Sequence, residues 1–134
     1  MTLSLRTCWT VFLGLGLLFA AGGCSKKVVA RGQLLDKGKA VTFGVKDRMF
    51  MNFHPDGEPE SGKKYLAKVN AETGEFEIRD ADGSGIPPGK YKVTAMLQSP
   101  YPMGQDRWKD KYSFRNSKLV VDVGDTPLEI DLGK

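Results

Sequence analysis

The sequence predicts an all-β domain, an antiparallel β-sandwich of seven or eight strands. After residue 27, short apolar runs are separated by turn residues about every 8 to 12 positions, the spacing typical of sandwiches. Two runs, residues 75–79 and 90–97, alternate apolar with polar side chains, as strands do when one face is buried and the other solvated. Only one segment, residues 105–112, could form a short helical turn, so strands are expected to build the core.

Residues 1–23 have the features of a secretory signal and are expected to be removed. The segment carries one base, Arg6, and no acid, and it is rich in Leu, Phe and Val between residues 9 and 21. A membrane-spanning helix needs about 20 apolar residues, but this run ends earlier, at Ala20-Ala21-Gly22-Gly23. The sequence therefore predicts a cleaved leader.

Cys24 directly follows these small residues, and the arrangement resembles the lipobox of bacterial lipoproteins. The resemblance implies that the Cys24 sulfur receives a diacylglyceryl group and that Cys24 becomes the new N-terminus. Two or three acyl chains would then anchor it stably. Residues 24–27 form a short tether, in which Lys26 and Lys27 would meet anionic headgroups. The expected location is the periplasmic or cell-surface face of a bacterial membrane. Cys8 leaves with the leader, so no disulfide is expected.

Five strands are expected in the first part of the domain, which covers residues 28–134. In the third of them Met49, Met51 and Phe53 alternate onto one face, which indicates a strand with a single buried side. Clusters of turn residues separate the neighbours. The expected strands are residues 28–35, 40–45, 48–54, 65–70 and 75–79.

The second part of the domain contains a strand at residues 90–97, an irregular segment and two further strands. Pro100, Pro102 and Gly104 break the chain within residues 98–117 before the possible helical turn. Alternating apolar residues then predict strands at 118–123 and 127–132.

Several short motifs resemble those of carboxypeptidase regulatory-like domains, which are transthyretin-like or prealbumin-like sandwiches with an immunoglobulin-like architecture. The most specific is a proline-glycine turn that enters a strand at a tyrosine. The motifs are Gly32-Gln33-Leu34, Lys37-Gly38-Lys39, Phe53-His54-Pro55, Thr73-Gly74-Glu75-Phe76 and Ile86-Pro87-Pro88-Gly89-Lys90-Tyr91-Lys92-Val93. The resemblance implies a non-catalytic accessory domain, because peptidase chemistry in that family belongs to a separate domain.

No catalytic or metal-binding constellation is evident, and neither an enzyme nor a cofactor is expected. His54 is the only histidine, whereas catalytic zinc requires three protein ligands. The acidic turn at 80–85 begins like a calcium loop, but Tyr91 occupies the twelfth position, where such a loop has its closing Glu. The net charge of +4 is spread without a block of like charges, which argues against nucleic-acid binding.

One segment, residues 98–117, contains a candidate ligand or partner surface. It places Tyr101, Trp108, Tyr112 and Phe114 among four bases. Exposed, these rings would form a platform for a sugar, a peptidoglycan fragment or a partner protein. Buried, they would instead close the open end of the sandwich, and this lid is favoured because a small domain needs such residues to complete its core.

The function expected from the sequence is that of a lipid-anchored binding or structural module of the cell envelope. Its partners would be the membrane, through the lipid on Cys24, and an envelope protein or glycan. The alternative is an accessory subunit of an envelope transport or assembly system, and an enzyme is a distant third.

Overall fold

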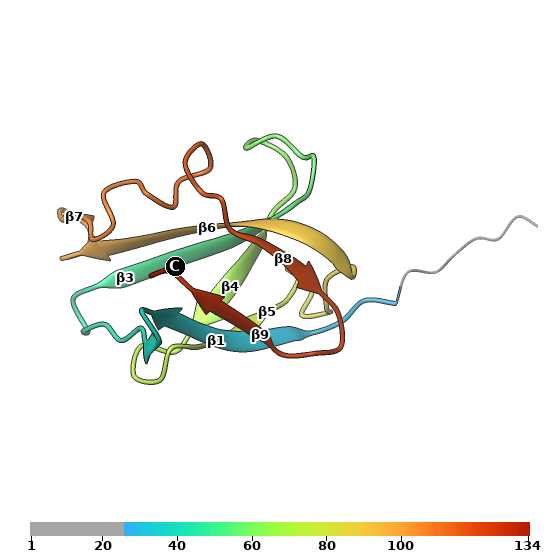
Figure 1. Cartoon of the computed structure of the whole chain (residues 1–134), viewed down its shortest axis with the longest axis horizontal. Coiled ribbons are helices and arrows are strands. Elements are labelled where there is room, and N and C mark those ends of the chain that lie inside the picture. Colours follow the sequence, from blue (N-terminus) through green and yellow to red (C-terminus); the bar gives the residue numbers. More distant parts are fainter. Residues whose placement is uncertain (1–25) are drawn as a thin grey trace, which may run out of the picture.

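The computed structural model describes residues 26–134, and within them every regular element is a β-strand (Figure 1). This confirms the prediction of an all-β domain over the described residues. No helix long and apolar enough to cross a membrane occurs in that part of the chain. The strands are β1 (Ala30–Asp36), β2 (Lys39–Ala40), β3 (Arg48–Pro55), β4 (Tyr65–Val69), β5 (Glu75–Ile78), β6 (Gly89–Ser99), β7 (Gln105–Asp106), β8 (Val120–Val123) and β9 (Leu128–Asp131).

All nine strands belong to one sheet that curls around the core (Figure 1). The main path runs β2-β1-β5-β4-β3-β6-β7, while β8 pairs with β6 and β9 pairs with β1. Every pair is antiparallel except β1 with β9, which are parallel in register from Gly32–Leu128 to Leu35–Asp131. The sequence did not predict this parallel pair, because apolar alternation is the same in either strand direction.

Strand alternation decides which side chains enter the core. On β3, Met51 and Phe53 point inward and are fully buried, whereas Phe50, Asn52 and His54 point to the outer face. The ring of Phe53 lies 5.9 Å from that of Phe76, centroid to centroid, and so joins β3 to β5 across the interior. The two planes are inclined by 39°, and aromatic contacts at this distance add to the free energy of burial.

The strand predicted at residues 40–45 is wrong beyond Ala40. Val41 is still buried, but the chain then turns, and the Asp47 carboxylate accepts a hydrogen bond from the Gly44 amide at 2.9 Å. This side-chain bond stabilises a turn in place of a strand ladder.

The helical turn predicted at residues 105–112 is also wrong. Gln105 and Asp106 form β7, and the following residues make successive turns, such as the one closed by the Lys111 amide and the Trp108 carbonyl at 3.0 Å. The Asp106 carboxylate accepts the amides of Trp108 and Asp110, so the Asp110 amide bonds this side chain and not the Asp106 carbonyl, its acceptor in a helix.

Three short segments that follow β6 in the sequence pair with its second edge, the one not paired with β3. The chain between the first and the last of them forms a loop. β8 pairs with the start of β6, the Tyr112 carbonyl accepts the Ala95 amide at 3.0 Å, and β7 pairs with the strand's end. The chain between β7 and β8, residues 107–119, therefore leaves the edge and returns to it. We call it the roof loop; Figure 1 shows it beside β6.

Candidate functional site

The structure separates the four aromatic residues singled out in the sequence. Tyr112 is 5% exposed, and its hydroxyl donates a hydrogen bond to the Leu132 carbonyl. The half-buried indole of Trp108 meets the Tyr112 ring edge-on at 5.7 Å. These two residues join the core cluster, as a lid would. The Phe114 ring instead contacts His54, with centroids 4.9 Å apart, and the Tyr101 ring lies 6.2 Å from that of Phe50, so the four rings do not form one exposed platform.

Tyr101 lies at a tip where two turns meet. Its amide donates a hydrogen bond to the Lys46 carbonyl at 2.7 Å, and the Arg48 guanidinium lies 5.3 Å from its ring centroid. Val45 and Met103 project into solvent from the same two turns and are about fully exposed, at 103% and 90%. We refer to Val45, Lys46, Arg48, Tyr101 and Met103 as the tip.

A pocket of about 180 Å³ lies between the outer face of β3 and β6 and the roof loop. The residues that point outward from the paired strands form its floor, and Ser113 and Phe114 of the roof loop close it from above. Its walls also include charged residues at the rim. The lining comprises Phe50, Asn52, His54, Glu60, Lys64, Thr94, Ala95, Met96, Asp106, Asp110, Tyr112, Ser113 and Phe114.

His54 is the most buried polar residue that lines this pocket. The residue is only 3% exposed, although it points to the outer face of its strand, because the roof loop covers it. Its Nε2 lies 3.3 Å from the Thr94 hydroxyl on β6, and its Nδ1 is buried without a hydrogen-bond partner within residues 26–134. A buried polar atom left unpaired costs about 1–3 kcal/mol.

Burial also keeps the imidazole neutral. Loss of solvation lowers the pKa of His54 below its usual value, and the positive charges of Lys64 and Lys92 lower it further. The negative charge of Glu60 opposes this shift only in part. At neutral pH the ring therefore offers one donor and one acceptor, of which Thr94 engages one.

The contact between Thr94 and His54 does not amount to a nucleophile with its base. A catalytic histidine is oriented by a third group on its second ring nitrogen, and that atom, Nδ1, has no partner among the described residues. Residues 26–134 also contain no group of three or more His, Cys, Asp or Glu side chains that could hold a metal ion. The arrangement can offer hydrogen bonds to a ligand.

A larger hollow of about 790 Å³ lies over the outer sides of β1, β4, β5 and β9. It is an open groove, and two of its charged side chains, Arg31 and Glu77, form an ion pair at 2.9 Å. The smaller pocket is lined by His54, whose Nδ1 is the buried side-chain atom without a partner in residues 26–134, so we take that pocket as the candidate site.

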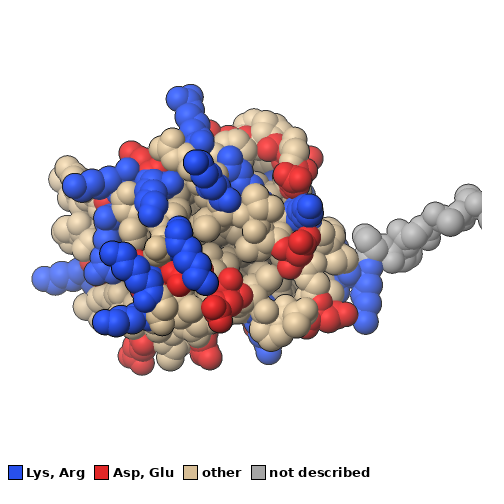
Figure 2. Space-filling view, viewed as in Figure 1, with Lys and Arg blue, Asp and Glu red and all other residues tan. Residues whose placement is uncertain are grey.

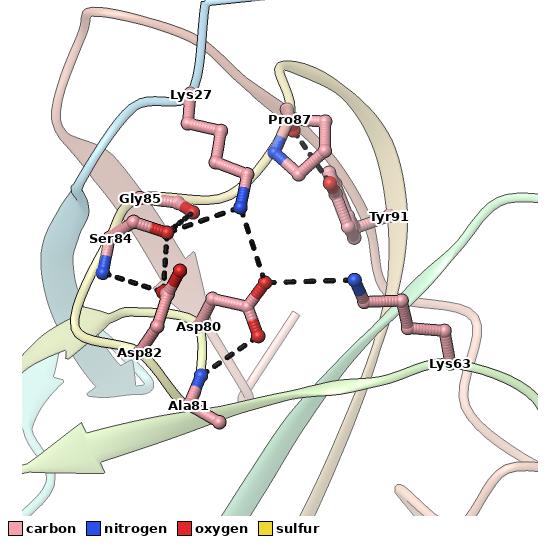
Figure 3. A network of polar contacts seen from close by, with 9 residues as sticks. All are labelled: Lys27, Lys63, Asp80, Ala81, Asp82, Ser84, Gly85, Pro87 and Tyr91. Carbon is pink, nitrogen blue, oxygen red and sulfur yellow. Dashed lines mark hydrogen bonds and ion pairs between the residues drawn. The ribbon is translucent and has the colours of Figure 1, made fainter.

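The acidic turn at residues 80–85 holds Lys27, at the start of the domain, by an ion pair (Figure 3). One Asp80 oxygen faces the ammonium groups of Lys27 and Lys63, at 3.5 and 3.6 Å, and the other accepts the Ala81 amide. The Ala81 bond and the two lysines lower the pKa of Asp80. Its carboxylate oxygens are therefore occupied by donors from the protein itself.

Positive charge is distributed unevenly over the surface. Figure 2 shows that Lys and Arg side chains gather on the half of this face that lies away from the N-terminal trace. The exposed Arg48 of the tip belongs to the start of β3, which Figure 1 places at that same end.

Comparisons with known proteins add no relative: no protein-family model, no curated protein and no solved structure matches the chain. Cys24, the predicted lipidation site, lies outside the described residues.

The sequence did not single out Thr94 or the pocket role of His54. The alternation of side chains along β3 and β6 could have placed both residues on the outer face, because Asn52 pairs with Thr94 and His54 with Lys92 there.

Proposed function

We propose that this protein is an exported lipoprotein whose β-domain is held at a bacterial membrane by lipid on Cys24 and binds an envelope glycan without catalysis. The observation that supports the anchoring is that few residues separate Cys24 in the sequence from Val28, the first residue held by backbone pairing. Val28 and Ile86 exchange two backbone hydrogen bonds, at 2.8 and 2.7 Å. Only Ser25, Lys26 and Lys27 lie between, a reach of roughly 10 Å when extended.

The fold supports assignment to the transthyretin-like sandwiches. The sheet curls so that the β1, β5 and β9 side faces the β3, β6 and β8 side, with one core between them (Figure 1). The motif with two prolines also has a structural role, because the Tyr91 hydroxyl donates a hydrogen bond to the Pro87 carbonyl at 2.6 Å. That bond ties the proline-glycine turn to the strand that follows it.

A binding role is supported by the chemistry of the pocket at His54. Its floor offers neutral hydrogen-bonding groups next to aromatic and aliphatic side chains, and it has no nucleophile with an oriented base. Such a mixture suits a ligand with hydroxyl groups and apolar faces, as glycans have.

The experiment that tests the anchoring compares two cysteine substitutions in the full-length chain expressed in bacteria. Cys24→Ser should abolish incorporation of radiolabelled palmitate and release the protein to the soluble fraction or leave an unprocessed precursor. Cys8→Ser is the matched control, because it removes a thiol from the leader, and it should leave labelling and membrane attachment unchanged. Mature Cys24→Ser protein that stays membrane-bound would refute the proposal.

A second candidate function, an accessory subunit that docks a protein partner, is favoured by the tip. Val45 and Met103 are the two most exposed large hydrophobic residues of the described chain, and bases surround them. A photo-crosslinking residue at position 103 should then yield one defined adduct in intact cells, whereas the same residue at Val120, also exposed, should not. Equal labelling at both positions would contradict the docking role.

A further inference from the structure

We propose that the tip inserts Val45 and Met103 into the surface of an anionic lipid bilayer, at the end of the domain opposite the anchor. This contact goes beyond the proposed glycan binding, and its geometry rests on the proposed anchor at Cys24. A protein partner at the same tip is the competing occupant, and the experiment separates the two.

Two apolar side chains project from the tip into solvent. Val45 is 103% exposed and Met103 90%, the largest fractions among the large hydrophobic side chains of residues 26–134. Tyr101 is 47% exposed beside them, and tyrosine is typical of the interface between lipid and water. Insertion at the boundary between headgroups and acyl chains removes this apolar surface from water, which is favourable.

The two turns that carry these side chains hold each other in place. The Tyr101 amide donates to the Lys46 carbonyl at 2.7 Å, and the Ser99 hydroxyl donates to the Asp47 carboxylate at 2.6 Å. The same carboxylate accepts the Gly44 amide at 2.9 Å. These bonds keep the turns ordered before any contact, so insertion requires little further ordering of the chain. Polar groups already bonded within the protein also enter a region poor in water at a lower cost.

Three exposed bases lie at this end of the domain. Lys46 and Arg48 belong to the tip, and Arg107 adjoins it, with its guanidinium 3.5 Å from the Thr42 carbonyl oxygen. The Arg48 guanidinium lies 5.3 Å from the Tyr101 ring centroid, next to the exposed apolar groups. Bases close to an anionic leaflet are attracted to it, so they would support the insertion.

Two acids occur in the same segments, residues 42–48 and 98–107, but donors of the protein bond both of them. Asp47 accepts the Ser99 hydroxyl, and Asp106 accepts the amides of Leu97 and Asp110, at 3.0 and 2.9 Å. Both acids are half-buried, whereas the three bases are exposed. The charge that these segments present to solvent is therefore mainly positive, and an anionic surface complements it. Figure 2 shows Lys and Arg gathered on the same half of the molecule.

The small size of the tip favours a lipid surface over a protein. Stable protein interfaces bury about 800 Å² per partner, and two projecting side chains with one half-exposed tyrosine supply only part of such an area. A bilayer requires no complementary shape, because acyl chains and headgroups adapt to the side chains that enter them.

The tip lies far from the proposed anchor. Val28, the first paired residue, is bonded to Ile86, which precedes β6, whereas Tyr101 follows the end of that strand. The eleven residues of β6 span about 35 Å, compared with roughly 10 Å for the tether. Figure 1 shows the start of β1 and the short β7 at opposite ends of the molecule. With one end held at a membrane, the tip faces away from it, toward a second, apposed bilayer.

The test places the full-length protein in phosphatidylcholine nanodiscs and adds sucrose-loaded vesicles of equal parts phosphatidylglycerol and phosphatidylcholine. The discs should sediment with these vesicles, and about tenfold less with vesicles of phosphatidylcholine alone, which offer the bases no net negative charge. Nanodiscs without the protein are the control and should stay in solution. Equal sedimentation with both kinds of vesicle would overturn the inference. Sedimentation with neither would also overturn it, and would leave a protein as the occupant of the tip.

Substitutions at the tip test both parts of the contact. Met103→Ser should weaken sedimentation about tenfold, because an inserted side chain is lost. Lys46→Gln should weaken it about fivefold, because one base is lost. Val120→Ser, at an exposed position of β8, is the matched control and should change nothing. Unchanged binding of Met103→Ser would show that charge alone holds the discs, and the insertion would be refuted.

Failure of the anchor and failure of the tip give different results. If the anchor is wrong, the protein separates from the discs, and the effect of Met103→Ser on its own sedimentation with the anionic vesicles still reports on the tip. If the protein stays in the discs but the discs do not sediment, the anchor stands and the contact at the tip is wrong. Glycan binding is tested separately, since no residue of the tip lines the pocket at His54.

Discussion

The ring of Phe114 meets the His54 imidazole edge-on, with centroids 4.9 Å apart and planes inclined by 68°. This contact joins the roof loop to the outer face of β3. The Lys92 ammonium lies over the same ring, 4.6 Å from its centroid, so Phe114 contacts both a cation and the buried imidazole. Protonation of His54 would place a second positive charge near Lys92, beneath the roof loop.

The stability of the domain should fall as the pH is lowered from neutrality. Burial lowers the pKa of His54 in the folded state, so the unfolded chain binds a proton more readily. The free energy of unfolding should decline below the unfolded-state pKa of about 6.5, by at most about 1.4 kcal/mol per pH unit, until the folded-state pKa is reached. Urea unfolding at a series of pH values measures this, and His54→Gln should remove the part of the decline that His54 causes. An identical decline in wild type and variant would contradict it.

Replacing Trp108 by alanine should destabilise the domain. The half-buried indole packs on Tyr112 and the core, so its removal should cost about 2 kcal/mol, less than for a fully buried tryptophan. Tyr101→Ala is the matched control, because that ring is 47% exposed at the tip, and it should change the free energy of unfolding by less than about 0.5 kcal/mol. Equal effects in urea unfolding would show that Trp108 is not a lid residue.

Removing one hydroxyl at Tyr112 should loosen the end of the chain. Tyr112→Phe keeps the buried ring and removes the donor to the Leu132 carbonyl, which should cost about 1–2 kcal/mol. Amide exchange of Leu132, whose own N–H bonds the Leu35 carbonyl at 2.7 Å, should quicken. Unchanged exchange at Leu132 would mean that the hydroxyl contributes nothing to holding this end.

Gly85→Ala should detach the first residues of the domain. A Cβ at Gly85 would lie 2.2 Å from the carbonyl carbon and oxygen of Val28, so the exchange of hydrogen bonds between Val28 and Ile86 could not persist. We expect protection of the Val28 amide against hydrogen exchange to be lost, with a destabilisation of about 1–3 kcal/mol. Gly124→Ala is the control, because nothing lies within 4 Å of its added Cβ, and it should leave Val28 protected.

Strand positions were predictable where one side chain in two is buried. Met51 and Phe53 lie in the core as their alternation indicated, and β5 and β6 match residues 75–79 and 90–97 within about two residues. The turn near Gly44 and the short β7 were not predictable, because each depends on one carboxylate, Asp47 or Asp106, bonding nearby amides.

The candidate pocket was predictable only in part. Alternation places His54 and Thr94 on the outer face, which in a single curled sheet is normally solvated. Their burial depends on a loop that leaves the edge of β6 and folds back over it, and no local pattern specifies that path. The sequence identified the loop as the region of interest, but not the floor beneath it.

The parallel pairing of β1 and β9 has a mechanical consequence. The start of β1, next to the proposed anchor, and the end of β9 lie at opposite ends of a ladder of four residue pairs. A load between the membrane and a partner bound near the end of β9 would pull these strands along their length in opposite directions. The hydrogen bonds of the ladder would then be stressed together, in shear, instead of being peeled apart one at a time. The geometry suits a domain that stays folded while it is under tension.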